Sequence, residues 1–554
     1  MTTAGTDKET GSRAEDEETA ESRPFRLARL RRRPHWWGVA GIALLTTVLQ
    51  GALGIEQYRN FWVGAYDLAI FDQGIRGYAD FGMPVSAVKD VHDAAQVIPG
   101  YGHAFSLLGD HFSPILALLA PLFWIWNNPV VLLIAQAALF GAAVPSIWLF
   151  TRRALRRIAP ERTAVFAAYG VAFAYGISWP LQMASQAGFH EVGFFTLLSA
   201  IMIERYQAGK LRTATVAALA LLLVKEDTGY VVAAFGILLL VTRQINGVPL
   251  AREALRRYRL TGGALVVGGV AVAYAVENWW LPAFGGQRGY YWYYGQLGSN
   301  LPSALWKIVS DPVYAYHLAT EPGVKVHTFL LLVWPLLFCC LLSPLSLTAV
   351  PLLAERAFSS KSEHWNLDQH YNAFLAAILF MAAVDGVVRL RRLAPVVRAR
   401  WFPRMRRPGP GFSKRFVQVW IAGILVSALV MVVQAPMPLR QIFSTGPWES
   451  GPYVTAQNAA VAKVLGGIGS NGGCVEADND IAPHLVSRAD VLMLDAVPHG
   501  CPWVVLQTAT VSYPFSGPAG ERARAQWLVA HGYQLVFSSN EVFVYHRPTA
   551  LPNQ

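Results

Sequence analysis

The chain has little charge for its length. Charged residues make up 15% of its 554 residues, whereas a soluble domain usually carries about 25%. Hydrophobic residues make up 54%, and long apolar runs recur from one end to the other. These proportions exclude an ordinary soluble globular domain and predict an α-helical polytopic membrane protein.

Cysteine is also scarce, with four in the chain. No Cys-x-x-Cys pair and no Cys/His spacing typical of zinc modules occurs, which argues against such a module. Cys339 and Cys340 lie within an apolar run, whereas Cys474 and Cys501 lie in the polar C-terminal region. If that region lies outside the cytoplasm, its compartment is oxidising, and we expect Cys474 and Cys501 to form a disulfide.

Acidic residues are scarce in the arginine-rich segments that separate the apolar runs. The net charge is +11, yet the basic residues fall into short blocks. This pattern is typical of cytoplasmic loops and argues against a nucleic-acid partner. A basic cluster at residues 26–33 precedes the first apolar run. We therefore place the N-terminus in the cytoplasm and the segment that follows the first span outside it.

Counted from that orientation, the apolar runs predict a multi-pass membrane protein with about eleven spans. Residues 213–242 could form one long helix or two short ones. One helix would leave the charged triplet 225–227 inside the membrane and an arginine-rich loop outside, so we predict two. The apolar run 111–126 is shorter than the roughly 20 residues that a span needs, and it predicts a re-entrant or interfacial helix.

Three parts follow from this topology. We expect a disordered cytoplasmic tail at 1–34, a membrane domain at 35–434 with long outer loops at 55–128 and 282–326, and an extracytoplasmic α/β domain at 435–554. The first span is expected to serve as an uncleaved signal. Within the last part, helices are predicted at 455–466 and 519–531, strands at CVEADND, DVLMLDAV and WVVLQTA, and a hairpin at YQLVFSSNEVFVYHR.

Five segments place polar groups at outer span ends. These groups are Asp67 with Asp72; Asp110 with His111; His190 with Glu191; Lys225, Glu226 and Asp227; and Glu363, His364, Asp368 and His370. Each segment alone has an ordinary explanation, such as a solvated turn or a helix N-cap. Together on one face they indicate a functional site, because ionisable groups at membrane depth are costly.

The first of these segments, GAYDLAIFDQGIR, holds two carboxylates in apolar surroundings. Asp67 and Asp72 are five residues apart, about 140° around an ideal helix, so they do not form a close pair. Asp72 and Arg76 have the i,i+4 spacing of an ion pair. The aromatic run 290–294 in the second outer loop could stack on a sugar or a prenyl chain, or form an interfacial belt.

The motifs YDLAIFDQ, GDHFSPILALLAPLF, FHE, LLLVKEDTG and DQHYNAFLAAILF occur in that order. Over about residues 60–540 the chain resembles a bacterial membrane-protein family that is defined only as a domain of unknown function. That family is similar to the glycosyltransferase-C superfamily, which includes protein O-mannosyltransferases and aminoarabinose transferases. The resemblance implies many spans, an extracytoplasmic active site and a sugar donor on a polyprenyl-phosphate carrier.

The resemblance also implies roles for single residues. In that superfamily an acidic motif in the first outer loop carries the catalytic carboxylate, and Asp67 stands at the matching position with Asp72 behind it. An inverting transfer needs one general base, which would be Asp67. The usual Asp-Glu pair of that motif is absent from this chain. A divalent cation, Mg²⁺ or Mn²⁺, between Asp67 and Asp110 is an option that the ligand spacing does not require.

The remaining motifs correspond to substrate-binding positions of the superfamily. Asp110 and His111 replace a Lys-Pro-Pro-Leu stretch whose lysine is missing here, the triplet 225–227 corresponds to a lysine turn, and His370–Tyr371 corresponds to an Arg-Tyr or His-Tyr pair. Lys225, with His111 or His370, is expected to bind the carrier phosphate. The other predicted contacts to substrate come from His190, Glu191, Glu226 and Asp227.

The expected function is therefore the transfer of a sugar from a polyprenyl-phosphate carrier to a glycan, lipid or protein of the cell envelope. A non-catalytic scaffold for envelope assembly and a lipid or glycan transporter are the alternatives. A transporter would need internal repeats and mid-span charges, and the sequence shows neither apart from Asp385, next to a basic loop. An enzyme of this kind is expected to gather Asp67, His111, His190, Lys225 and His370 in one outer cavity.

Overall fold

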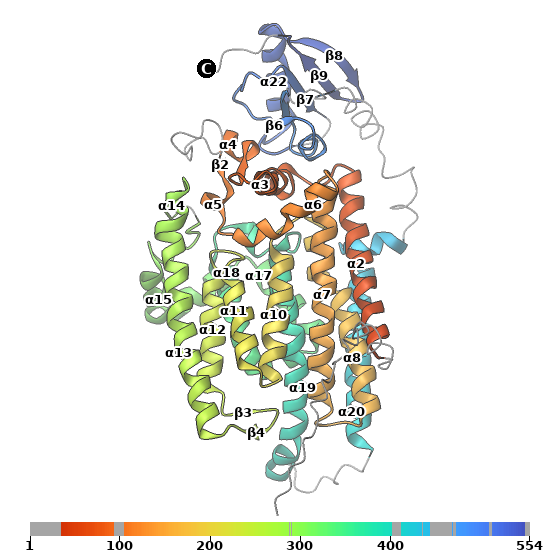
Figure 1. Ribbon diagram of the computed structural model, residues 1–554, viewed down its shortest axis with the longest axis vertical. Coiled ribbons are helices and arrows are strands. Elements are labelled where there is room, and N and C mark those ends of the chain that lie inside the picture. The colour runs from red at the N-terminus through yellow and green to blue at the C-terminus, as the bar shows by residue number, and fades with distance from the viewer. Residues whose placement is uncertain are drawn as a thin grey trace, which may run out of the picture. The chain divides into compact units, whose positions relative to one another are not determined.

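The computed structural model describes residues 35–92, 105–286, 288–289, 291–401, 411–434, 436–443, 468, 473–508 and 512–548. Over these residues the chain is mainly helical, with one larger sheet in its C-terminal part (Figure 1). The tail at 1–34 and the helix expected at 455–466 lie outside the described residues.

Six helical stretches of the described chain are long and apolar enough to cross a membrane. They are formed by α2 (His35–Arg59), α7 (Val130–Leu155), α8 (Glu161–Gly176) with α9 (Trp179–Gln186), α13 (Arg252–Ala275) with its extension, α19 (Ala373–Trp401) and α20 (Phe412–Val433). Other apolar helices are shorter than the roughly 20 residues that a span needs. The count of about eleven spans therefore stays a prediction.

The long helices pack side by side, both with neighbours in the chain and with helices from distant segments. α7 packs on α8 and on α10 (Val192–Gln207), and α10 packs on α19 (Figure 1). α12 (Thr228–Val241) packs on α13, and their glycines allow close approach: a Cβ added at Gly269 would lie 2.9 Å from the backbone nitrogen of Ala233. Small residues permit such contacts where no hydrophobic effect drives helices together.

The segment 211–241 forms the two short helices that the charge pattern predicts. α11 (Leu211–Leu221) ends before the triplet 225–227, and α12 begins at Thr228 directly after it. The run 111–126 also forms short pieces, η3 (Pro114–Leu119) and α6 (Ala120–Ile125). The prediction of two short helices around 225–227 is confirmed, whereas the re-entrant or interfacial position of 111–126 stays a prediction.

The apolar runs 327–342 and 345–358 are two of the roughly eleven spans that the sequence predicts, and in the structure neither forms a continuous helix. They consist of short pieces: α17 (Val324–Val333), η5 (Trp334–Leu336), η6 (Cys339–Leu342), η7 (Pro344–Ala349) and α18 (Val350–Phe358). Pro335 and Pro344 remove backbone donors. Leu337 and Phe338 both have left-handed backbone angles, with φ of 53° and 55°. The chain therefore turns where the sequence predicts helix.

The segment between α2 and η3, which is the predicted first outer loop, is a series of short elements. They are η1 (Ala65–Asp67), α3 (Ala69–Ala79), β1 (Val85–Ser86), α4 (Ala87–His92), β2 (Phe105–Ser106) and α5 (Leu107–Asp110). Leu68, with φ of −143°, separates η1 from α3, so Asp67 and Asp72 do not share one helix. The chain between these two acids changes direction, and their side chains have separate surroundings.

Further short elements complete the rest of the membrane part. They are the strands β3 (Gln244–Ile245) and β4 (Val248–Pro249), and the helices η4 (Val276–Trp280), α14 (Leu281–Ala283), α15 (Leu301–Ser310), α16 (Pro312–Thr320), η8 (Ser362–His364), η9 (His370–Asn372) and η10 (Pro438–Phe443). β3 and β4 form a small antiparallel hairpin between α12 and α13. η9 leads directly into α19, so His370 lies at the start of a long apolar helix.

The C-terminal part contains a five-stranded mixed sheet in the order β6-β5-β7-β9-β8. Its elements are β5 (Cys474–Ala477), η11 (Ala482–His484), β6 (Asp490–Met493), β7 (Trp503–Gln507), α22 (Pro518–Ala530), β8 (Gln534–Ser539) and β9 (Val542–His546). Asn540 and Glu541 both have positive φ, as a tight hairpin turn requires. Cys474 and Cys501 form a disulfide with a Cα–Cα distance of 5.1 Å. The predicted strands, hairpin, second helix and disulfide are confirmed.

Candidate functional site

Asp67 lies beside two histidines from distant parts of the chain. Its Oδ1 is 3.3 Å from Nε2 of His190, and the imidazole of His190 stacks on that of His370 with ring centroids 3.4 Å apart. The side chain of Asp67 is 35% exposed, whereas both histidines are buried. The group therefore presents one accessible carboxylate backed by two buried imidazoles.

The backbone holds Asp67 against the loop that carries His190. The carbonyl oxygen of Asp67 accepts a hydrogen bond of 2.9 Å from the N–H of Phe189. The preceding residue, Gly188, has φ of +108°, and a Cβ added there would lie 2.8 Å from the same carbonyl oxygen. Glycine is required at this position both by the backbone angle and by the close approach.

A buried glutamine fixes the other side of this loop. The Nε2 of Gln136, on α7, donates to the carbonyls of Gly188 (2.8 Å) and Ala184 (3.3 Å), and its Oε1 accepts from the N–H of His190 (2.8 Å). Sequence reasoning missed Gln136. The sequence does contain one indication of its role, because Gln136 is the single amide in the apolar run VVLLIAQAALF.

Lys225 extends the network from the turn between α11 and α12. Its Nζ is 3.9 Å from Oε1 of Glu191 and lies over the ring of Tyr371, 5.2 Å from the centroid. Burial disfavours the charged form of Lys225. The carboxylates of Asp227, Glu226 and Glu191 outweigh that cost and raise its pKa well above the usual value. Lys225 therefore keeps its charge with counter-ions close by.

A second pair of acids and bases continues from Glu226. Its Oε1 is 3.0 Å from Nδ1 of His111. Asp110 has an Oδ1 3.3 Å from Nζ of Lys89 and accepts a hydrogen bond from the hydroxyl of Tyr291. Burial alone would raise the pKa of Asp110, but the charges of Lys89 and His111 lower it below its usual value. Asp110 is thus an ionised group held by a lysine and a tyrosine.

Lys361 joins the same electrostatic neighbourhood. Its Nζ lies over the ring of Tyr293, 5.2 Å from the centroid. Burial lowers the pKa of Lys361, Glu363 opposes this, and the positive charges of Lys225 and Lys89 lower it further. Lys361 therefore lies within electrostatic range of two other ammonium groups, and the carboxylate of Asp110 offsets part of their repulsion.

The sequence patterns contained neither Lys89 nor Lys361 as candidate residues. Both are single lysines in irregular outer segments, and only the folded chain brings them together with Lys225. The aromatic run supplies part of the setting, since Tyr291 contacts Asp110 and Tyr293 packs edge-on against His364. Tyr290 lies outside the described residues.

Asp72 has surroundings of its own. It is fully buried, and its Oδ2 is 2.5 Å from Nε of Arg76. Burial raises the pKa of Asp72 to about 6, although the hydrogen bond and charge of Arg76 oppose that change. The expected pair with Arg76 is therefore present, and Asp72 faces this arginine within α3.

The expected outer cavity differs from what the structure shows. A small cavity of about 10 Å³ lies beside Asp110 and His111, and Asp67 does not line it. The polar groups instead form one packed network, in which His370 contacts Tyr371 and Tyr371 lies under Lys225. Close packing is expected, because a buried charge is stable only when partners satisfy it directly.

The C-terminal part contributes to the segment that carries Asp67. Oδ1 of Asn479 accepts a 2.9 Å hydrogen bond from the N–H of Ala65 in η1. A Cβ added at Gly64 would lie 2.6 Å from Nδ2 of Asn479, so glycine permits this contact. Burial raises the pKa of Asp480 to about 6, a hydrogen bond from Asn479 opposes it, and the charge of Asp67 adds to it. Asp480 is therefore within electrostatic range of Asp67.

One group of side chains has the geometry to hold a metal ion. Asp67, His190 and His370 each offer a ligand atom, and these atoms lie within 4.8 Å of one another. The buried Nδ1 atoms of both histidines have no hydrogen-bond partner among the described residues. Two imidazoles and one carboxylate suit a first-row transition metal better than Mg²⁺. Asp110, the expected second ligand, is instead engaged by Lys89 and Tyr291.

The described chain is thus a helical membrane protein with a network of ionisable groups at one set of helix ends. Residues 57–516 match a family described as a predicted membrane protein, DUF2079. The match covers most of the chain, and the protein belongs to this family. The family resemblance of the motifs is therefore confirmed. No curated protein matches the chain.

Two solved structures of the Archaeoglobus fulgidus oligosaccharyltransferase are similar to this chain. One is tethered to an acceptor peptide, with 12% identity, a TM-score of 0.38, and coverage of 93% of this chain and 74% of that one. The other, AglB with an inhibitory peptide and a dolichol-phosphate, has 10% identity, a TM-score of 0.36, and coverage of 86% and 70%.

We predict that Gln136→Ala destabilises the protein by at least about 2 kcal/mol, because buried groups lose their partners at roughly 1–3 kcal/mol each. Thermal unfolding of the purified protein in detergent measures the effect. Ile134→Ala is the matched control, since Ile134 lies on the same helix with a side chain that is 37% exposed. Equal unfolding temperatures for the two variants would show that Gln136 does not hold the loop.

Proposed function

We propose that the chain is a membrane glycosyltransferase that moves a sugar from a polyprenyl-phosphate carrier to an acceptor hydroxyl. The observation that carries this proposal is the contact between the accessible carboxylate of Asp67 and the buried pair His190–His370. A carboxylate that is reachable from one side and held by an imidazole on the other suits a general base. The motif resemblance to the glycosyltransferase-C superfamily supports the same role for Asp67.

The proposed reaction is a single displacement with inversion. Asp67 accepts the proton of the acceptor hydroxyl, whose oxygen forms a bond to the anomeric carbon of the sugar. The bond between that carbon and the phosphate oxygen breaks, and polyprenyl phosphate leaves with the electron pair. Asp67 needs a fixed orientation for this step, which the hydrogen bond from Phe189 to its carbonyl supplies.

The leaving phosphate needs positive charge nearby. Lys225 was the expected ligand, but its charge is already balanced by Glu191, Glu226 and Asp227. Lys361 is a better ligand for the incoming anion, because the neighbouring ammonium groups destabilise its charge. We therefore assign the carrier phosphate to Lys361. Lys89, which already pairs with Asp110, would stabilise the phosphate at longer range together with Lys225 and His111.

A divalent transition metal is proposed at Asp67, His190 and His370, whose ligand atoms and unpartnered nitrogens fit one. When bound, such an ion would supply Lewis-acid stabilisation of negative charge near the donor. The residues themselves position Asp67 in either case, since His190 contacts its carboxylate directly.

The finer expectations stay proposals. These are about eleven spans, an N-terminus in the cytoplasm and the C-terminal domain outside a bacterial plasma membrane. We also propose that the acceptor is a glycan, lipid or protein of the cell envelope, as the outer position of Asp67 would require. The hydrogen bond from Ala65 of η1 to Asn479 supports a role of the C-terminal domain beside Asp67.

We predict that Asp67→Asn lowers sugar transfer by roughly 10²–10⁴-fold, the usual contribution of a general base. The purified protein is incubated with several polyprenyl-phosphate sugars, and released polyprenyl phosphate is measured. Asp80→Asn is the control, because Asp80 is an exposed acid at the end of α3. Unchanged turnover in Asp67→Asn would remove Asp67 as the base, and no turnover of any donor by the wild type would argue for the scaffold alternative.

For the donor site, Lys361→Gln is expected to raise KM for the donor by about tenfold with little change in kcat, as loss of one charge-assisted contact would. Initial rates over a range of donor concentrations separate the two constants. Lys307→Gln serves as control, since Lys307 is an outer-loop lysine paired with Asp311. A KM that is unaffected by Lys361→Gln contradicts the placement of the phosphate.

The metal proposal can be tested by direct binding, without an enzyme assay. Isothermal titration of the full chain with MnCl₂ and with ZnCl₂ is expected to show about one binding site, as a single three-ligand group would give. His370→Ala should abolish it. His364→Ala, at a nearby buried histidine outside the group, should leave binding intact. Equal binding by the two variants would rule out this ligand set.

A further inference from the structure

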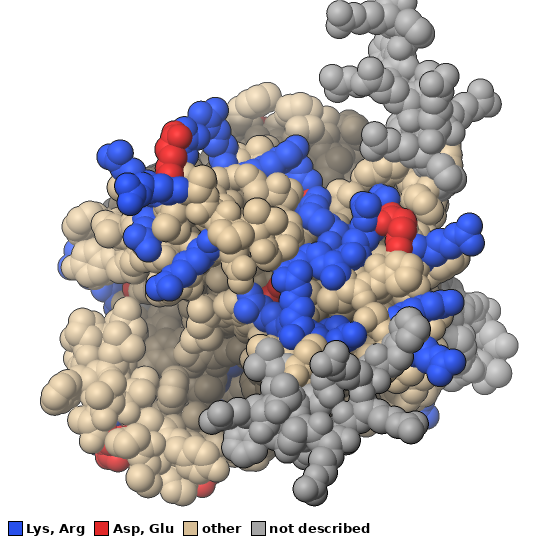
Figure 2. Space-filling view, turned by 90° about the horizontal axis from the view of Figure 1, so that it is seen from below, with Lys and Arg blue, Asp and Glu red and all other residues tan. Residues whose placement is uncertain are grey.

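A second polar region lies at the end of the bundle that carries β3 and β4 (Figure 1). A cavity of about 320 Å³ opens there between the segment after α7, the end of α10, the β3–β4 hairpin and α19. Seen from this end, Lys and Arg cover much of the face and acidic residues are few (Figure 2). The cavity shares no lining residue with the network around Asp67 and Lys225, so any ligand that it binds is separate from that site.

The lining of the cavity is rich in arginine. Arg157, Arg389 and Arg392 line it, and Asp385 is the one acid among the lining residues. Asp385 is already engaged, since its Oδ2 accepts from Nε of Arg389 at 2.6 Å and from the hydroxyl of Ser343 at 2.8 Å. Arg157 and Arg392 therefore have no ion pair among the residues that the structure describes.

The charge of Arg157 is destabilised where it lies. Its Nε is buried and has no hydrogen-bond partner in the described part of the chain. Burial lowers the pKa of Arg157, the neighbouring charge of Arg392 lowers it further, and the carboxylate of Asp385 opposes both. An anion in the cavity would accept a hydrogen bond from Arg157 and would offset the repulsion between the two guanidinium groups.

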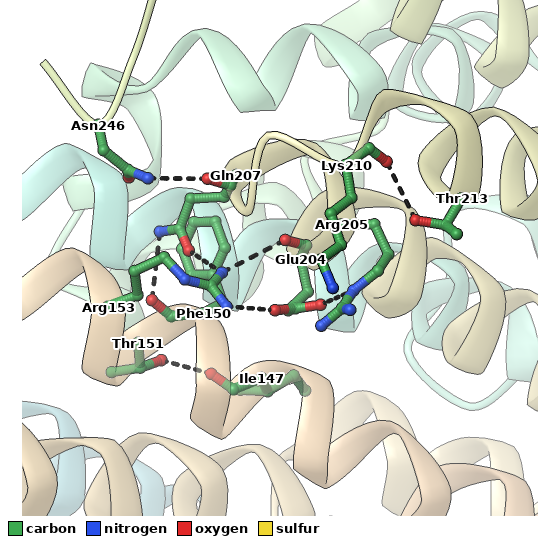
Figure 3. A network of polar contacts seen from close by, with 10 residues as sticks. All are labelled: Ile147, Phe150, Thr151, Arg153, Glu204, Arg205, Gln207, Lys210, Thr213 and Asn246. Atoms are coloured by element: carbon green, nitrogen blue, oxygen red, sulfur yellow. Dashed lines mark hydrogen bonds and ion pairs between the residues drawn. The ribbon is translucent and has the colours of Figure 1, made fainter. Parts of the chain in front are cut away.

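The polar wall opposite these arginines is fixed before any ligand arrives. Nδ2 of Asn246 donates to the carbonyl of Gln207 at 2.8 Å, and the Gln207 side chain bonds to Arg153 and to the carbonyl of Phe150 (Figure 3). Oδ1 of Asn246 is buried without a partner among the described residues. The wall is thus preorganised, which lowers the entropic cost of binding.

The rim of the cavity is apolar and exposed. Leu342, Leu390 and Leu393 line it with side chains that are 50%, 42% and 57% exposed. A free phosphate would gain nothing from such a rim, whereas acyl chains would cover it. Basic pockets between membrane helices are known to hold anionic lipid headgroups.

We propose that this cavity binds the phosphate headgroup of an anionic phospholipid. Arg157 and Arg392 contact the phosphate oxygens, and the acyl chains lie along Leu342, Leu390 and Leu393. The basic character of this face places the lipid in the cytoplasmic leaflet. The lipid would bridge α7, α19 and the β3–β4 hairpin, segments that the cavity otherwise separates.

The full chain, delipidated in an uncharged detergent, is titrated with dioleoyl phosphatidylglycerol and bound lipid is counted by native mass spectrometry. Dioleoyl phosphatidylcholine and glycerol 3-phosphate form parallel arms. The Arg157→Gln/Arg392→Gln variant should bind phosphatidylglycerol at least about tenfold more weakly, since two charge-assisted contacts are lost. Arg256→Gln/Arg259→Gln is the control, because it removes the same charge from exposed positions of α13.

Tight phosphatidylglycerol binding that falls in the cavity variant and persists in the control supports the proposal. Equal loss in both variants would mean general surface charge, and equal binding of glycerol 3-phosphate would mean a soluble anion; either result overturns the lipid proposal. Arg392→Glu is a second variant for the case that Arg157→Gln misfolds, since Arg392 is exposed and its replacement leaves the core intact. Unchanged lipid binding in Arg392→Glu also overturns it.

Discussion

Charges at membrane depth need partners, and this requirement shapes the outer end of the molecule. An ion removed from water is costly, so each buried ionisable group must meet an opposite charge or a hydrogen-bond partner. Lys225 meets Glu191, Asp110 meets Lys89, and His111 meets Glu226. The short helices α11 and α12 fit the same requirement, because the turn between them brings Lys225 and Glu226 to their partners in this buried network.

Two groups of the network, Asp67 and Lys361, have only part of their charge balanced by neighbours, and the proposed chemistry rests on these two. Asp67 keeps an exposed face while its other side contacts His190. Lys361 is crowded by the charges of Lys89 and Lys225. A neutral framework holds Asp67 in place, in which Gln136 and Gly188 fix the loop of His190 without adding charge.

On the opposite, basic face the charges that lack partners are positive. Arginines gather there in excess of acids, and two of them line a cavity without ion pairs in the described structure. On the outer side the protein supplies its own counter-ions. On the basic side the proposed counter-ion is an anionic lipid headgroup from the membrane.

Several features follow from the sequence alone because their signals are local. The membrane class, the two short helices around 225–227, the Asp72–Arg76 pair, the strands and hairpin of the C-terminal sheet, and the Cys474–Cys501 disulfide were all predicted from composition, charge pattern or spacing. The motifs also marked Asp67, His190 and His370 individually as polar groups at span ends. No pattern in the chain said that these three would touch.

Tertiary structure decided those contacts, because residues 67, 190 and 370 come from segments that only helix packing brings together. It also decided the roles of Gln136, Lys89 and Lys361, each a single polar residue without a local pattern. The break at Leu337 and Phe338 escaped prediction, since apolar residues in left-handed conformation carry no sequence signal. The sequence thus determined which residues are polar at the membrane boundary, and packing determined which of them meet.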